Sequence, residues 1–182
     1  LISLTSFGNA EVRRHGQLYF AKLSAAAGAD GFEVREELLI DAVQELPALA
    51  AYAQAHQLRT VYSCPQPLFA VDGTLDTAVL QHAIAATHTL GAPWLKMSIG
   101  GFAAQSVAHS AQGFAALKQA IADAGITLLI ENDQTTPAGT VQALQRFFDA
   151  ADAAGLPLPM TFDMGNWHYL GECALQAAQL FG

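Results

Sequence analysis

Cysteine and positive charge are both scarce in this sequence of 182 residues. Its two cysteines, Cys64 and Cys173, lie far apart and form no Cys-x-x-Cys pair, which fits a reducing compartment and supports neither a disulfide framework nor a metal site built on cysteine. Eight lysines and arginines stand against sixteen acidic residues, for a formal net charge of −8. Because binding to a phosphate backbone needs clustered positive charge, we expect no nucleic-acid partner.

Long apolar runs and targeting signals are also absent from the sequence. No apolar run approaches the roughly 18 residues that a membrane-spanning helix needs, and the first residues, Leu1 to Ser6, lack the basic region of a signal peptide. We therefore expect a cytoplasmic protein without a membrane partner. With 52% hydrophobic and 13% charged residues, the chain can bury a sizeable core, and we interpret residues 1–182 as a single domain.

Short apolar segments alternate with longer, alanine-rich amphipathic segments along the whole chain. The pattern predicts six strands, at Ile2–Ser6, Gly31–Arg35, Thr60–Ser63, Trp94–Ile99, Thr127–Asn132 and Met160–Asp163. It predicts helices near 11–27, 41–56, 76–90, 104–124, 138–154 and 171–181. Asp41 with Gln44 resembles a capping box, and Thr136 before Pro137 is typical of a helix start.

Six successive strand–helix units indicate a parallel sheet, either doubly wound or closed as a (β/α)8 TIM barrel. A dinucleotide-binding fold needs a G-x-G-x-x-G turn after the first strand, but the sequence there, Ser6-Phe7-Gly8-Asn9-Ala10, has one glycine. Polar and aliphatic residues alternate along the strands; Lys96, for example, lies between Leu95 and Met97. A barrel with polar residues inside and aliphatic residues under the helices fits this alternation.

A complete barrel of this kind has eight units and typically about 250 residues. This sequence stops at Gly182 after the sixth helix. We therefore expect an incomplete TIM barrel that lacks the last two βα units, since six units alone leave two strand edges open. Dimerisation that covers both edges is the alternative.

Two of the predicted strands end in acidic and amide side chains. The apolar run at Leu128–Ile130 leads directly into Glu131, Asn132 and Asp133, and the next strand leads into Asp163. Because the carboxyl ends of parallel strands meet at one rim, these side chains are expected to lie together. Carboxylates gathered at such a rim are typical of a divalent-metal site.

Three segments in order resemble the xylose-isomerase-like TIM barrels, a superfamily of sugar phosphate isomerases and epimerases. They are Gly31-Phe32-Glu33, Ile130-Glu131-Asn132, and Phe162-Asp163-x-Gly165-Asn166. The resemblance implies a divalent metal (Mn²⁺, Mg²⁺, Zn²⁺ or Co²⁺) with Glu131 and Asp163 as its first two ligands and the other two beyond Gly182. Members often form dimers or tetramers, so a homo-oligomer is an open option.

The resemblance and the chemistry together predict a sugar or polyol isomerase or epimerase. Proton transfer between adjacent carbons needs a polarised carbonyl and a carboxylate base, and Glu131 is predicted to be both ligand and catalytic base. We predict substrate contacts from Glu33, Lys96, Asn132, Asn166 and His168. Many relatives carry histidine at the position of Asn166, and asparagine cannot titrate near neutral pH, which argues against a nuclease-like multi-metal site.

Each of these residues also has a structural interpretation. Glu131 and Asp163 could be ion-pair partners of Lys96 or Arg35. Glu33 could form a structural pair with Lys96. Asn132 could cap the loop before Thr136, and His168 could be a solvated loop residue.

Other functions also fit the sequence. An inosose-dehydratase-like lyase would use the same metal and base, and a non-catalytic barrel would bind a small molecule without metal. An apurinic-site endonuclease is disfavoured by the acidic charge and by Asn166.

Overall fold

The computed structural model describes residues 1–102 and 107–181. The chain forms two compact units, one made of Leu1–Pro65 with Gln81–Leu95 and the other of Gln66–Leu80 with Lys96–Gly182. The first three residues of the helix predicted at 104–124 lie outside the described residues.

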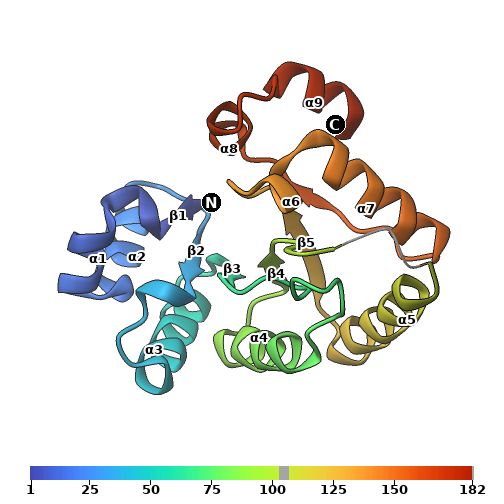
Figure 1. Ribbon diagram of the computed structural model, residues 1–182. Coiled ribbons are helices and arrows are strands. Elements are labelled where there is room, and N and C mark those ends of the chain that lie inside the picture. Colours follow the sequence, from blue (N-terminus) through green and yellow to red (C-terminus); the bar gives the residue numbers. More distant parts are fainter. Residues whose placement is uncertain (103–106, 182) are drawn as a thin grey trace. The chain divides into compact units, whose positions relative to one another are not determined.

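The first unit contains three parallel strands in the order β1 (Ile2–Ser3), β2 (Gly31–Arg35) and β3 (Arg59–Ser63) (Figure 1). Their register pairs Ile2 with Phe32 and Glu33 with Val61. β2 was predicted with the observed bounds. The strand predicted at 2–6 is shorter than expected, because residues 4–7 form a 3-10 helix, η1 (Leu4–Phe7).

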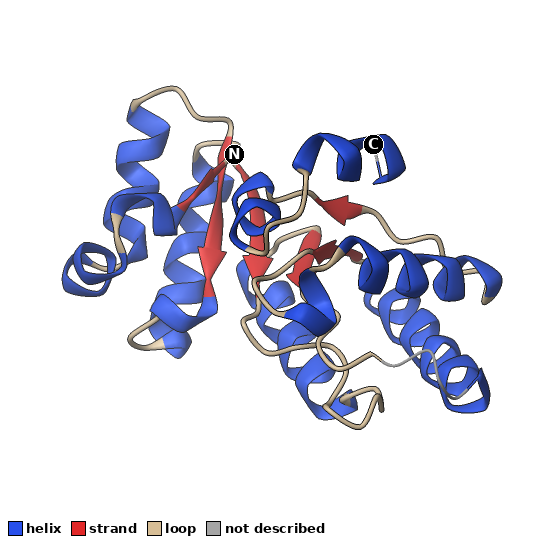
Figure 2. Ribbon diagram, turned by 45° about the horizontal axis from the view of Figure 1, so that its top comes forward, coloured by secondary structure: helices blue, strands red, loops and turns tan. Residues whose placement is uncertain are grey.

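The helices of this unit lie along its strands (Figure 2). They are α1 (Asn9–His15), α2 (Gln17–Ala26), η2 (Glu36–Leu38), α3 (Ala42–Ala55) and most of α4 (Thr77–Leu90). The single helix predicted at 11–27 is wrong, because Gly16, with φ of 77°, breaks it in two, and a positive φ suits glycine. The Asp41 cap is confirmed, since its carboxylate accepts from the backbone N–H of Val43 and Gln44. The reciprocal partner predicted at Gln44 is wrong, because the Asp41 N–H donates to Glu45 Oε1.

The second unit contains strands in the order β4 (Trp94–Met97, which begins in the first unit), β5 (Thr127–Glu131) and β6 (Met160–Thr161). β5 and β6 are parallel, with Ile130 opposite Met160 and Glu131 opposite Thr161. The described helices of this unit are α5 (Val107–Ala124), α6 (Thr136–Gly139), α7 (Val141–Ala153), α8 (Met164–Tyr169) and α9 (Ala174–Phe181).

Two predictions in this unit need correction. The helix predicted at 138–154 begins at Val141, where the Thr140 hydroxyl accepts from the Ala143 N–H. Thr136 is therefore the first residue of the separate short helix α6 and does not cap α7. The strand predicted to reach Asp163 ends at Thr161, and α8 follows at once, because Asp163 caps that helix.

An aromatic cluster forms much of the core of the second unit. Phe69, Phe102, Phe114 and Phe147 lie with ring centroids 5.2 to 6.1 Å apart. Most of these pairs are edge-to-face or tilted, the arrangement that aromatic quadrupoles favour. Phe69, Phe114 and Phe147 are at most 1% exposed, so these rings belong to the buried core of the unit.

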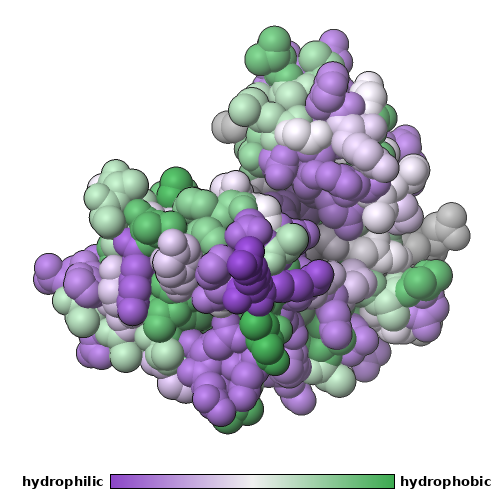
Figure 3. Space-filling model, turned by 90° about the vertical axis from the view of Figure 1, so that its left-hand side faces the viewer, coloured by the Kyte–Doolittle hydropathy of each residue, from purple (hydrophilic) through white to green (hydrophobic). Residues whose placement is uncertain are grey.

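The surface mixes polar and apolar residues. Figure 3 shows hydrophobic residues interspersed with hydrophilic ones on the face that it displays. Exposed apolar side chains include Tyr19 and Leu23 of α2, and scattered residues of this kind are normal on protein surfaces. Within the described ranges, no helix has the length and apolar character needed to cross a lipid bilayer.

We predict opposite effects on stability for two glycine substitutions. A Cβ on Gly31 would collide with the Arg59 carbonyl oxygen of the neighbouring strand, so Gly31→Ala should lower the free energy of unfolding by about 1 to 3 kcal/mol. Gly113 lies within α5, and a Cβ there would meet Phe69 at an ordinary contact distance of 3.5 Å. Gly113→Ala should therefore raise the free energy of unfolding by about 0.5 to 1 kcal/mol. Urea unfolding measures both, and equal effects would contradict the close approach of β2 and β3.

Candidate functional site

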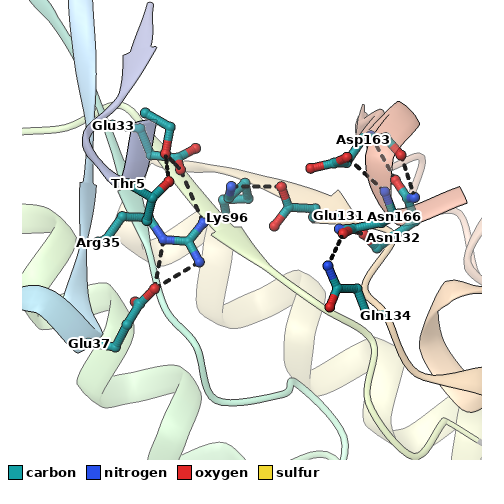
Figure 4. Close-up of polar contacts among 11 residues, drawn as sticks. Thr5, Glu33, Arg35, Glu37, Lys96, Glu131, Asn132, Gln134, Asp163 and Asn166 are labelled. Carbon is teal, nitrogen blue, oxygen red and sulfur yellow. Dashed lines mark hydrogen bonds and ion pairs between the residues drawn. The ribbon is translucent and has the colours of Figure 1, made fainter. Parts of the chain in front are cut away.

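Two carboxylates lie at or just after the ends of β5 and β6. Glu131 is the last residue of β5, and Asp163 follows β6 by two residues. Since the two strands are parallel and paired, both acids lie at the same edge of the sheet, as the sequence predicted. Figure 4 shows the Asp163 carboxylate directed toward the side on which Glu131 lies.

Glu131 forms an ion pair with a buried lysine of β4. The Lys96 ammonium lies 2.8 Å from Glu131 Oε1, and the two side chains are 4% and 19% exposed. A buried ammonium needs a compensating charge, and β4 and β5 are neighbours in the sheet. The ion pair proposed as the structural alternative for Glu131 is therefore present, and it fixes one carboxylate oxygen next to a cation.

Asp163 has a different partner. Its Oδ1 accepts a hydrogen bond from the backbone N–H of Asn166 at 3.0 Å, which caps the N-terminus of α8. A carboxylate at an N-cap is stabilised by the unpaired N–H groups and the dipole of the helix. The local sequence therefore holds the Asp163 side chain in place through the helix that follows the strand.

Asn132 is completely buried and joins the ends of β5 and β6. Its Nδ2 donates to the Asp163 carbonyl oxygen and its Oδ1 accepts from the Asp163 N–H, both at 2.8 Å. The alternative that Asn132 caps the following loop is wrong, because Asp133 does so. Asp133 Oδ1 accepts from the backbone N–H and the hydroxyl of Thr135 at 2.7 and 2.6 Å.

The other predicted residues of this unit lie on or near α8. Asn166 Nδ2 donates to the Asn132 carbonyl oxygen at 2.7 Å, and Asn166 Oδ1 accepts from Gln134 at 3.0 Å. His168 is exposed on α8. The structure thus brings Lys96 to Glu131, and Asn132 and Asn166 to Asp163 (Figure 4). Sequence reasoning missed Gln134, whose only signal is its position two residues after Asn132.

Glu33 lies in a polar cluster of the first unit. Its Oε1 accepts from Ser3 Oγ at 2.8 Å and lies 3.2 Å from Arg35 Nη1, while Arg35 also pairs with Glu37 at 2.9 Å. Burial alone would lower the pKa of Arg35, but Glu37 and Glu33 outweigh it and raise that pKa above its ordinary value. Gln17 holds the Arg35 backbone through two hydrogen bonds of 2.8 and 2.9 Å.

Tyr62 near the end of β3 was not predicted as a site residue. It is 1% exposed, and burial, followed by the charge of Glu36 and a hydrogen bond to it, raises the pKa of its phenol. Glu36 Oε1 also lies 2.8 Å from His82 Nε2. The signal that could have indicated this cluster is the position of Glu36 directly after β2, next to the strand that carries Tyr62.

The donor set of the second unit fits one half of a divalent-metal site. Glu131 and Asp163 offer hard carboxylate oxygens, which suit Mg²⁺ and Mn²⁺ and are also found around Zn²⁺. Across residues 1–102 and 107–181, no group of three or more His, Cys, Asp or Glu side chains could hold a metal ion. Two carboxylates thus need further ligands to bind a divalent ion tightly.

Comparison with known proteins gives structural but not sequence relatives. No protein-family profile matches the sequence, and no curated protein is significantly similar to it. A xylose isomerase domain-containing protein of Salmonella typhimurium LT2 matches over 93% of this chain and 62% of its own, with 15% identity and a TM-score of 0.64. D-Allulose 3-epimerase of Methylomonas sp., solved with D-allulose, matches over 100% and 67%, with 20% identity and a TM-score of 0.67.

A third match is the IOLI protein, solved with a bound zinc atom. It matches over 86% of this chain and 60% of its own, with 15% identity and a TM-score of 0.57. The chain thus spans about two thirds or less of the length of these three proteins. The likeness shows the fold, which is that of a (β/α)8 barrel, and the described residues supply six of its strands in sequential order, as predicted.

The Lys96–Glu131 ion pair gives a testable stability prediction. Lys96→Met leaves the largely buried Glu131 carboxylate without this cation and should lower the free energy of unfolding by about 2 to 4 kcal/mol. Adding Glu131→Gln should recover part of the loss, because the two effects are coupled. Urea unfolding of the single and double variants measures the coupling.

An exposed ion pair is the matched control. Arg59 and Asp30 lie 4.0 Å apart with side chains 62% and 80% exposed, so Arg59→Met should change stability by less than about 0.5 kcal/mol. Additive effects of Lys96→Met and Glu131→Gln would show that the pair contributes nothing to stability.

The buried Tyr62 phenol leads us to predict that the protein loses stability at alkaline pH. Its raised pKa means that the folded state keeps the phenol proton while the unfolded state releases it near pH 10. The stabilisation is therefore fully present below pH 10 and declines above it, by up to about 1.4 kcal/mol per pH unit. Tyr62→Phe should flatten this decline, measured by urea unfolding between pH 9 and pH 11, whereas Tyr169→Phe, at an exposed position, should not. Equal slopes for wild type and Tyr62→Phe would contradict the assignment.

Proposed function

We propose that the chain carries part of the active site of a divalent-metal-dependent sugar or polyol isomerase or epimerase. The observation that carries the proposal is the pair of carboxylates, Glu131 and Asp163, at the ends of neighbouring parallel strands. A fold shared with a D-allulose 3-epimerase supports a sugar as the substrate class. A zinc-binding protein with the same fold supports the metal.

Glu131 and Asp163 would hold the metal through carboxylate oxygens. A divalent ion bound there would polarise the carbonyl and neighbouring hydroxyl of a sugar, which would make the proton on the hydroxyl-bearing carbon next to the carbonyl easier to remove. The chain would supply six units of a single eight-unit barrel domain, with the remaining ligands on the last two. The two-carboxylate set does not discriminate among Mn²⁺, Mg²⁺, Zn²⁺ and Co²⁺.

The side chains around the carboxylates have distinct proposed roles. Glu131 takes the proton from the substrate carbon, since it lies at the rim and 19% of its side chain is exposed. Lys96 Nζ lies 2.8 Å from Glu131 Oε1, and its proposed role is to stabilise negative charge that develops on a substrate oxygen. Glu33 and His168 remain predicted contacts for substrate hydroxyls.

Metal titration tests the proposal. Calorimetry with Mn²⁺ on the full-length gene product should show about one site, and Glu131→Gln or Asp163→Asn should abolish binding because each removes a ligand. Asp152→Asn, at an exposed position on α7, is the matched control and should bind like the wild type. The 182-residue chain itself should bind much more weakly.

The outcomes separate the candidate functions. If the full-length wild type binds no divalent metal, Glu131 and Asp163 are structural polar residues. The proposed function is then that of a barrel that binds a small molecule without catalysis. If metal binds, a panel of ketoses, aldoses and inososes with Mn²⁺ distinguishes isomerisation or epimerisation from loss of water, the result expected of the lyase alternative.

A further inference from the structure

Asn132 and Asn166 both form hydrogen bonds with Asp163. Asn132 binds the Asp163 backbone on both its N–H and its carbonyl oxygen, and the Asn166 backbone N–H donates to Asp163 Oδ1. Asn166 Nδ2 returns to the Asn132 carbonyl oxygen at 2.7 Å. Asn132, Asp163 and Asn166 thus form a closed ring of hydrogen bonds, which we call the amide clamp.

The clamp extends the β5–β6 ladder with a side chain. The regular register ends at Glu131 opposite Thr161, and the Asn132 amide then makes the donor and acceptor contacts that a further strand residue would make with its neighbour. The side-chain amide offers a donor and an acceptor side by side. Because Asn132 is completely buried, loss of either contact would leave an Asp163 backbone group without its partner.

The clamp also fixes the orientation of the Asp163 carboxylate. Oδ1 is held by the Asn166 N–H at 3.0 Å, and the carboxylate is directed toward the side on which Glu131 lies (Figure 4). Gln134 closes the clamp on the outside, where its Nε2 donates to Asn166 Oδ1 at 3.0 Å. Both polar groups of the Asn166 amide are therefore engaged within the chain.

We infer that Asn132 and Asn166 are positioning residues that hold Asp163 ready to bind a divalent cation, and that they do not contact the substrate. This inference rests on the proposed function. Outer-shell groups that orient a metal ligand typically change metal affinity by about 10- to 100-fold when they are removed. Gln134, whose side-chain amide donates to Asn166 Oδ1, is a peripheral part of the same device.

Mn²⁺ binding by the full-length protein tests the inference. Asn166→Leu keeps the backbone N–H to Asp163 but removes both side-chain contacts, and it should weaken Mn²⁺ binding by about 10- to 100-fold. Tyr169→Leu, at an exposed position on the same short helix, is the matched control and should bind like the wild type. Calorimetry well below the melting temperature, with circular dichroism of each variant, restricts the comparison to folded protein.

The result separates positioning from a merely structural role. A structural role would lower the melting temperature of Asn166→Leu without changing the Mn²⁺ affinity of the folded protein, and that outcome overturns the inference while the proposed function stands. A wild type that binds no Mn²⁺ overturns the proposed function and the clamp's role together. Gln134→Leu should weaken binding less than Asn166→Leu, and the reverse order would also contradict the inference.

Discussion

The two hydrogen bonds between the Asn132 amide and the Asp163 backbone determine the geometry at the ends of β5 and β6. They begin where the regular ladder stops, so they set the direction in which the chain leaves β6. That direction allows Asp163 to cap α8 at once. The position of α8, the orientation of the Asp163 carboxylate and the placement of Asn166 all follow from this contact, because each is linked to the next by a hydrogen bond.

Charge compensation is the second constraint on the site. The chain has only eight lysines and arginines, yet Lys96 and Arg35 are placed beside carboxylates in the interior of their respective units. Lys96 compensates Glu131 in the second unit, and Arg35 compensates Glu33 and Glu37 in the first. Burial of an unpaired carboxylate is costly, so polar strand residues that face the interior need these cations whether or not a ligand is bound.

The sequence predicted the number and order of the strands because alternation of polar and apolar residues along strands and glycines at the ends of helices are local signals. It did not predict the break at Gly16 or the separation of α6 from α7, since single residues decide them. The placement of Glu131 and Asp163 at one edge of the sheet could be predicted, because the ends of parallel strands meet there. The cap that Asp133 forms on Thr135 and the contact of Gln134 with Asn166 could not be predicted. Both depend on side-chain orientations that residue spacing does not define.

The same charges bear on how a divalent cation would bind. The Lys96 ammonium, 2.8 Å from Glu131 Oε1, offsets part of the negative charge of this carboxylate. The same ammonium would repel a divalent ion bound to Glu131 and Asp163, so tight binding requires ligands beyond these two carboxylates. A preoriented Asp163 reduces the entropy lost on binding, and the amide clamp is most valuable where, as here, the electrostatic attraction is weak.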